Sequence, residues 1–183
     1  MKFVPTELPG VVLVEPTVFA DARGFFYESW RRDIFAKNGL DVELVQDNHS
    51  RSARGTLRGL HFQHPHGQVK LCRVTSGEVY DVVVDVRAGS ATFGRWTAAS
   101  LSAENRRMIW IPAGFAHGFQ VVSESAEFLY KCSDYYAPGD EHGVVWNDPA
   151  LAIPWPVATP IVSAKDAKLP RLADLAARPP LGA

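Results

Sequence analysis

Residues 111–119 read IPAGFAHGF, and this stretch sets the first expectation for the fold. Pro112 and Gly114 are typical of a tight turn, and the apolar residues that follow favour a β-strand. The stretch therefore predicts a tight turn at residues 112–114 that leads into a strand over residues 118–122, with His117 between them.

Short β-branched or alternating runs lie on both sides of this unit. The predicted strands cover residues 42–45, 69–75, 79–86, 95–101, 108–111, 118–122 and 127–133. Turn residues such as Ser76-Gly77 and Pro138-Gly139-Asp140 separate them, a spacing that is typical of a sandwich or barrel. Residues 82–84 are three valines, so we expect that strand to be covered on both faces.

Helix signals are few. One short helix is predicted over residues 29–38, with Gly39 after its end, and a second over residues 163–168. Residues 171–183 contain Pro179-Pro180 and are expected to form a loosely ordered tail. The chain of 183 residues is long enough for one domain with a core, and we expect a single domain over residues 1–183.

Composition limits the function classes. The net charge of -1 gives no general basic surface for nucleic acid. No apolar run approaches the roughly 18 residues of a membrane span. Because the N-terminus lacks the apolar core of a signal peptide, we expect a cytoplasmic protein. Cys72 and Cys132 lie in apolar runs and are predicted to be buried free thiols.

Residues 112–117 have the spacing PxGxxH, which resembles the second motif of the cupin superfamily. That resemblance implies a mainly β, cupin-like jelly-roll barrel with a few short helices. The first cupin motif contains HxH, and the matching residues here are His61-Phe62-Gln63, with no glutamate at the usual spacing after them. A cupin metal site needs about three histidines and a carboxylate, so His61 and His117 make a poor cage. We therefore expect neither a metal nor another cofactor.

Several longer stretches identify a family. They are FADARGFFYE at 19–28, QDNHS at 46–50, LRGLHFQ at 57–63, EFLYKCSDYY at 127–136 and SAKD at 163–166. Together they closely resemble the dTDP-4-dehydrorhamnose 3,5-epimerase family. The resemblance implies conversion of dTDP-4-keto-6-deoxy-D-glucose to dTDP-4-keto-L-rhamnose, through an enolate, at C3 and C5. It also implies a homodimer in which an N-terminal strand crosses to the partner.

The resemblance assigns four catalytic roles. His61 is the base, Asp166 its carboxylate partner, Tyr130 the acid on the opposite face and Lys70 the cation at the enolate oxygen. Each has a plainer interpretation. His61 could be a hydrogen-bonded core histidine, Tyr130 a packing residue and Lys70 part of a solvated strand face. Ser163-x-x-Asp166 is also a capping-box pattern, and both roles of Asp166 could hold.

The remaining matches are substrate-binding positions. Arg23 and Arg58 suit pyrophosphate because a guanidinium group binds phosphate in a bidentate manner. Phe26 could stack on the base, and Tyr136 resembles a residue that packs near the keto-sugar. The full predicted set is Arg23, Phe26, Glu28, Gln46, Asn48, Arg58, His117, Tyr136, Glu141 and Lys165.

Three other functions stay open. A mono-epimerase acting at C3 or C5 alone would share nearly all the catalytic residues. A metal-dependent cupin and a non-catalytic sugar-nucleotide-binding module are the other two. His64-Pro65-His66-Gly67, expected to be a surface loop, and His142 fall outside the family pattern, and the sequence gives them no role.

Overall fold

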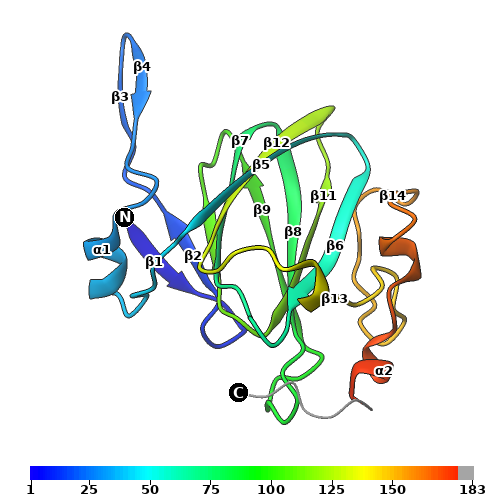
Figure 1. Cartoon of the computed structure of the whole chain (residues 1–183). Coiled ribbons are helices and arrows are strands. Elements are labelled where there is room, and N and C mark those ends of the chain that lie inside the picture. Colours follow the sequence, from blue (N-terminus) through cyan, green and yellow to red (C-terminus); the bar gives the residue numbers. More distant parts are fainter. Residues whose placement is uncertain (177–183) are drawn as a thin grey trace.

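Two β-sheets face each other across an apolar interior in the computed structural model, which describes residues 1–176 (Figure 1). One sheet has the order β1 (Lys2–Pro5), β2 (Val12–Glu15), β10 (Met108–Ile111), β7 (Lys70–Ser76), β12 (Ser125–Cys132) and β5 (Gln46–Ala53). The other has the order β13 (Glu141–Gly143), β6 (Thr56–Gln63), β11 (Phe115–Val121), β8 (Glu78–Asp85) and β9 (Trp96–Ser102), with β14 (Ile161–Val162) parallel to β6. This is the predicted jelly-roll barrel.

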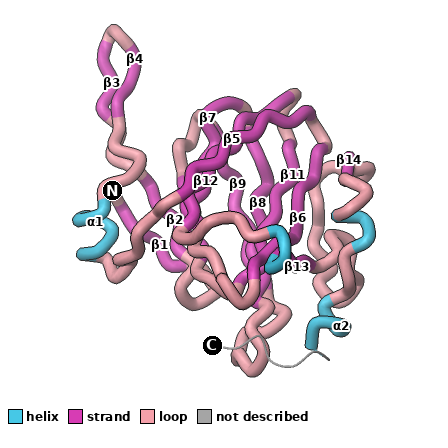
Figure 2. Tube along the Cα trace, viewed as in Figure 1, coloured by secondary structure: helices cyan, strands magenta, loops and turns pink. Residues whose placement is uncertain are grey.

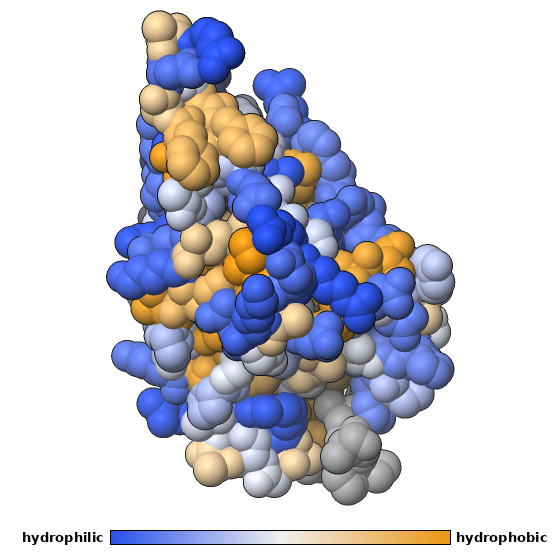
Figure 3. Space-filling view, turned by 90° about the vertical axis from the view of Figure 1, so that its left-hand side faces the viewer, coloured by the Kyte–Doolittle hydropathy of each residue, from blue (hydrophilic) through white to orange (hydrophobic). Residues whose placement is uncertain are grey.

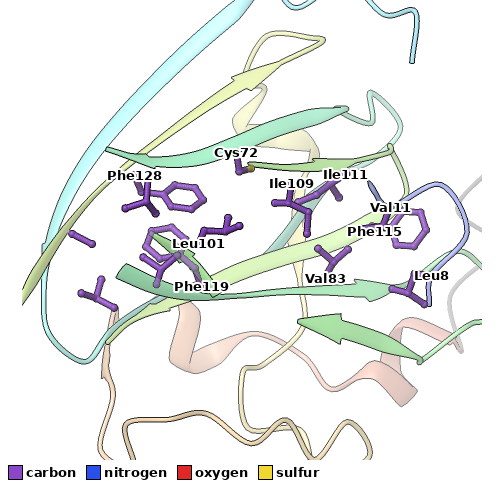
Figure 4. Close-up of a cluster of buried hydrophobic side chains, with 14 residues drawn as sticks. Leu8, Val11, Cys72, Val83, Leu101, Ile109, Ile111, Phe115, Phe119 and Phe128 are labelled. Carbon is purple, nitrogen blue, oxygen red and sulfur yellow. The ribbon is translucent and has the colours of Figure 1, made fainter. Parts of the chain in front are cut away.

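Aliphatic and aromatic side chains of both sheets fill the closed part of the barrel (Figure 4). Phe119 of β11 and Phe128 of β12 stack across the two sheets with their ring centroids 4.0 Å apart. Val83 of β8 joins this cluster, whereas its neighbours Val82 and Val84 pack in a second cluster on the outer face. The prediction that this strand is covered on both faces is confirmed.

The strand pair β6–β11 comes unusually close at two glycines. A Cβ on Gly59, whose φ is +122°, would lie 2.6 Å from the Cα of Gly118. The register of the two strands also shifts between His117 and Phe119. Only glycine fits such an approach and such a backbone. Because His61 and His117 are direct partners across this pair, the bulge lies beside two predicted site residues.

The C-terminal segment covers the outer face of the second sheet. Here α2 (Leu172–Ala176) buries Leu172 and Leu175 in the outer cluster. The buried carboxylate of Asp148 accepts a hydrogen bond of 2.6 Å from the backbone N–H of Leu172. The expectation of a loose tail from residue 171 is therefore wrong for residues 172–176, while residues 177–183 lie outside the described part.

Two other local predictions are corrected. Residues 42–45 form no strand; Val42 and Leu44 pack on a cluster around Trp110, and Val45 donates a backbone hydrogen bond of 2.8 Å to Cys132 at the end of β12. The first helix, α1 (Arg32–Lys37), is shorter than residues 29–38, and the second is only the 3₁₀ turn η2 (Asp166–Lys168). A further 3₁₀ turn, η1, spans Pro138–Asp140. Figure 2 shows how little of the chain is helical.

A two-stranded hairpin of β3 (Phe19–Asp21) and β4 (Gly24–Phe26) projects away from the barrel (Figure 1). It carries three exposed phenylalanines: Phe19 is 63% exposed, Phe25 57% and Phe26 66%. Figure 3 shows an orange, hydrophobic patch on the upper part of the molecule, where the hairpin lies. An apolar surface of this kind usually marks an interaction site.

Cys72 and Cys132 are buried free thiols, as predicted. Among residues 1–176, no helix has the length and apolar character needed to cross a bilayer.

Candidate active site

A cavity of about 620 Å³ lies between the two sheets, next to the aromatic core. A smaller hollow of about 360 Å³ adjoins it and shares five lining residues with it: Asn48, His61, Lys70, Tyr130 and Glu141. Most of the predicted site residues line one of these two spaces. They are Gln46, Asn48, Arg58, His61, Lys70, His117, Tyr130, Tyr136, Glu141, Lys165 and Asp166.

His61 and Asp166 form a close pair in the wall of the cavity. Nε2 of His61 lies 2.8 Å from Oδ1 of Asp166, and Oδ2 accepts a hydrogen bond of 3.2 Å from the backbone N–H of Gly59. Burial tends to raise the pKa of Asp166, but these hydrogen bonds outweigh it and hold that pKa below its ordinary value. The carboxylate therefore stays ionised and fixes the orientation of the imidazole.

Only the first half of the predicted capping box between Ser163 and Asp166 forms. The Ser163 hydroxyl accepts a hydrogen bond of 3.0 Å from the backbone N–H of Asp166 at the start of η2. The side chain of Asp166, however, turns to His61 and does not close a capping box. The backbone of this residue thus serves the turn, while its carboxylate serves the histidine.

Tyr130 reaches the same cavity from β12, in the sheet opposite to β6. Burial raises the pKa of its phenol to about 12, helped by the neighbouring Cys132 and Cys72. The phenol is therefore protonated at neutral pH and able to donate a proton into the cavity.

Lys70, on β7, lines both hollows, whereas the next residue, Leu71, packs in the cluster on the outer face. The predicted inward projection of Lys70 is therefore confirmed. The positive charge of Lys70 tends to lower the pKa of the buried Asp81 carboxyl, but burial outweighs this effect and that pKa is raised. A cation in this place suits a ligand that develops negative charge.

Asp81 is a site residue that the sequence did not single out. Nε2 of His117 lies 2.9 Å from Oδ2 of Asp81, and the Asp81 side chain is fully buried. The sequence signal for Asp81 is an acidic residue inside the apolar run of β8, since a buried carboxylate needs a hydrogen-bond partner. The ring of His117 also stacks on Phe128, which fixes its plane.

Three residues form a polar cluster at the rim. Lys165 Nζ lies 2.6 Å from Oε2 of Glu141, and the hydroxyl of Tyr136 donates a hydrogen bond to the same oxygen. Burial raises the pKa of Glu141, but the hydrogen bonds from Lys165 and Tyr136 bring it below the ordinary value. Elsewhere on the cavity wall, Arg58 Nε donates to the Ser52 hydroxyl at 3.2 Å.

Comparison with known proteins then decides the family. The sequence model described as dTDP-4-dehydrorhamnose 3,5-epimerase matches residues 5–174. A curated protein of that name from Pseudomonas aeruginosa is 56% identical over 176 residues, which cover 95% of this chain and 97% of the relative. This chain belongs to the dTDP-4-dehydrorhamnose 3,5-epimerase family.

Solved structures agree with membership of the epimerase family. RmlC from Legionella pneumophila, a dTDP-6-deoxy-D-glucose-3,5-epimerase in complex with dTDP-4-keto-L-rhamnose, matches with a TM-score of 0.92 at 47% identity, covering 95% of this chain and 96% of that one. ChmJ from Streptomyces bikiniensis, a 3'-monoepimerase in complex with dTDP-quinovose, matches with a TM-score of 0.89 at 39% identity, covering 93% and 87%.

Three predicted family positions do not reach the cavity of their own chain. Arg23 and Phe26 lie on the projecting hairpin, and Glu28 follows it. Arg23 Nη2 instead pairs with Asp21 at 2.6 Å, and Glu28 pairs with Arg31 at 3.4 Å, both in exposed positions. The hairpin forms a sheet of its own, and no barrel strand within residues 1–176 pairs with it.

The residues of the incomplete HxH motif do not fit a metal site. Nε2 of His61 and Nε2 of His117 each face a different carboxylate, and the Gln63 amide is bonded to backbone groups. Within residues 1–176, no group of three His, Cys, Asp or Glu side chains could hold a metal ion.

The histidines outside the epimerase pattern lie near the rim. The 64–67 segment is a surface loop, as predicted, and Nδ1 of His66 contacts Oδ2 of Asp140. The ring of His142 packs on Phe62 with the centroids 5.6 Å apart.

Proposed function

We propose that this chain converts dTDP-4-keto-6-deoxy-D-glucose to dTDP-4-keto-L-rhamnose by epimerisation at C3 and C5. One observation carries the proposal: His61 and Tyr130 reach one cavity from opposite sheets, with Lys70 beside them. A base and an acid on opposite sides of a sugar ring are what inversion at carbon requires.

Each inversion has two proton transfers. His61 removes the proton from the carbon beside the ketone, and the C–H electron pair moves into the ring to give an enolate. The ammonium group of Lys70 stabilises the negative oxygen. Tyr130 then donates its proton to the same carbon from the other face, the enolate collapses to the ketone, and both residues regain their starting protonation from solvent. The same residues serve C3 and C5 in turn.

The other lining residues bind the nucleotide sugar in this proposal. Arg58 holds the pyrophosphate, Tyr136 packs near the keto-sugar, and Gln46, Asn48, His117, Glu141 and Lys165 supply further contacts. We further propose a homodimer in which Arg23, Phe26 and Glu28 enter the partner's cavity. The support is the exposed hairpin, whose three phenylalanines would be buried by such an exchange. A cytoplasmic location also stays a proposal.

The deciding experiment is incubation with dTDP-4-keto-6-deoxy-D-glucose in deuterated water, followed by NMR of the sugar. Deuterium at both C3 and C5 is expected. Deuterium at one carbon only would replace the proposal with a mono-epimerase, a function that the similarity to ChmJ favours as the second candidate. No exchange at either carbon would leave a binding module. Activity that disappears with a chelator and returns with a metal would indicate a metal-dependent cupin.

A further inference from the structure

Three glutamine side chains hold four consecutive residues at the rim of the cavity. Gln68 Nε2 donates to the carbonyl of Asp134 at 2.8 Å. Gln46 Oε1 accepts from the backbone N–H of Tyr136 at 2.9 Å. Gln63 binds the residues on either side of Tyr136. Segment 134–137 is therefore fixed by side chains of β6, β5 and the β6–β7 connection, although no strand in the described part of the chain pairs with it.

Gln63 makes the largest contribution to this arrangement. Its Oε1 accepts from the N–H of Ala137 at 2.9 Å, and its Nε2 donates to the carbonyls of Tyr135 at 3.3 Å and His66 at 3.0 Å. The residue is only 6% exposed. Both donors of the amide and its acceptor are thus used, and these partners determine which end is oxygen and which is nitrogen.

No other side chain of similar size could replace this amide. Glutamate would bring a carboxylate against two carbonyl oxygens, and leucine would leave two carbonyls and one N–H without their partner. A histidine, which a complete HxH motif would have at this position, has only two ring nitrogens. It cannot offer two donors and one acceptor together, as the amide of Gln63 does. The departure from the cupin motif at position 63 therefore has a structural use of its own.

The segment matters because Tyr136 lies at its centre. Its backbone is clamped at the residues before and after it, and its hydroxyl donates to Glu141. The ring itself is 52% exposed, so few packing contacts restrain it. Its position beside the cavity depends on the clamped backbone and the one hydroxyl contact.

We propose that Gln63 is a positioning residue for the epimerisation, acting through Tyr136. This rests on the proposed function, in which Tyr136 packs near the keto-sugar. Gln63 fixes the position of the Tyr136 ring while the sugar is converted to the enolate and back. It transfers no proton itself.

The test compares Gln63→Glu and Gln63→Leu with a matched control, Gln120→Leu. Gln120 is a fully buried glutamine that clamps the backbone of Val157, with both bonds at 2.9 Å, away from Tyr136. All variants are assayed below their melting temperatures. Turnover of both Gln63 variants should fall on the order of tenfold to a hundredfold, with KM changed by less than about threefold, because the ring is misplaced in the reacting complex. Gln120→Leu should lose stability and keep its turnover.

A double-mutant cycle with Tyr136→Ala separates positioning from direct contact. If Gln63 acts through Tyr136, Gln63→Glu adds little in the Tyr136→Ala background. Additive losses would overturn the inference, as would wild-type turnover in both Gln63 variants or an equal loss in Gln120→Leu. These results leave the proposed function intact if the wild type still exchanges deuterium. An inactive wild type would overturn both.

Discussion

His61 and Asp166 stand 105 positions apart in the chain, yet Nε2 of the histidine lies 2.8 Å from Oδ1 of the carboxylate. Both carboxylate oxygens accept a hydrogen bond, since Oδ2 takes the backbone N–H of Gly59. Asparagine offers only one acceptor, so Asp166→Asn must present an NH₂ group to one of these donors. Either the His61 imidazole loses the hydrogen bond that orients it, or the backbone N–H of Gly59 at the bulge loses its acceptor.

For Asp166→Asn we expect turnover of the nucleotide sugar to fall by about 10²- to 10⁴-fold, with a much smaller change in KM. Steady-state assays and deuterium exchange measure both. Asp148→Asn is the control. Asp148 is another buried carboxylate that accepts backbone N–H groups, but it takes no part in the proposed reaction. The variant should lower the free energy of unfolding without this loss. Full turnover in Asp166→Asn would contradict the dyad.

Tyr130→Phe tests the acid. His61 can still remove a proton and return a deuteron on the same face, but no donor remains opposite. We expect formation of the inverted product to fall by about 10²- to 10⁴-fold while deuterium still exchanges into the substrate. Because burial raises the pKa of Tyr130 to about 12, the wild type should lose no activity through this phenol below about pH 11.

Tyr80→Phe serves as the control for loss of a phenol. Tyr80 also has a pKa raised by burial, but its ring packs on Trp155 on the outer face of the second sheet. Product formation in this variant should match that of the wild type. Equal product from Tyr130→Phe and Tyr80→Phe would remove Tyr130 from the mechanism.

Asp85 predicts how the barrel responds to acid. Its buried carboxylate accepts bonds from Arg87 at 2.7 Å and from the hydroxyls of Ser90 and Thr92, both at 2.6 Å. Burial tends to raise the pKa of Asp85, but these bonds hold it below the ordinary value. A carboxyl with a lowered folded pKa stabilises fully above its unfolded pKa of about 3.9 and loses that contribution as pH falls toward the folded value.

Asp85→Asn should therefore lower the free energy of unfolding by roughly 2–4 kcal/mol at pH 7, with a smaller deficit below about pH 4. Urea unfolding across this pH range measures both. Asp41→Asn is the control: Asp41 also pairs with an arginine, Arg32, but in an exposed position at 3.3 Å. It should leave stability unchanged within error. A constant deficit for Asp85→Asn at every pH would rule out the linkage.

The sequence predicts those parts of the barrel whose signal lies in a short run of neighbouring residues. Valines 82–84 lie in a strand because burial on both faces demands apolar side chains, and the turn before Phe115 also forms as expected. It fails at β5, whose residues QDNHSRSA carry no apolar signal. That strand exists because β12 pairs with it along its whole length, and such a long-range partner leaves no mark on a local pattern.

The site shows the same division. The motif residues His61, Lys70 and Tyr130 meet in one cavity as the family pattern implies. The pairing of Asp81 with His117 and the clamp by Gln63 depend on contacts between distant strands, so spacing alone could not give them. For Arg23 and Phe26 the pattern names residues whose own chain keeps them away from the cavity, so the prediction for them concerns a second chain.

Subunit complementation tests this prediction. One chain carries His61→Ala and the other Arg23→Ala, and each variant expressed alone is expected to have low activity. In a mixed dimer with exchanged hairpins, one of the two cavities combines an intact His61 with an intact Arg23 from the partner. Random pairing should then restore about a quarter of wild-type activity, since half of the dimers are mixed and each has one complete site. If each cavity used the hairpin of its own chain, no mixed dimer would contain a complete site, and co-expression would restore nothing. Activity of the co-expressed pair decides between the two arrangements. If the chains carry different tags and the mixed dimers are isolated over both tags, the expected activity rises to about half of wild type, since each mixed dimer keeps one of its two sites.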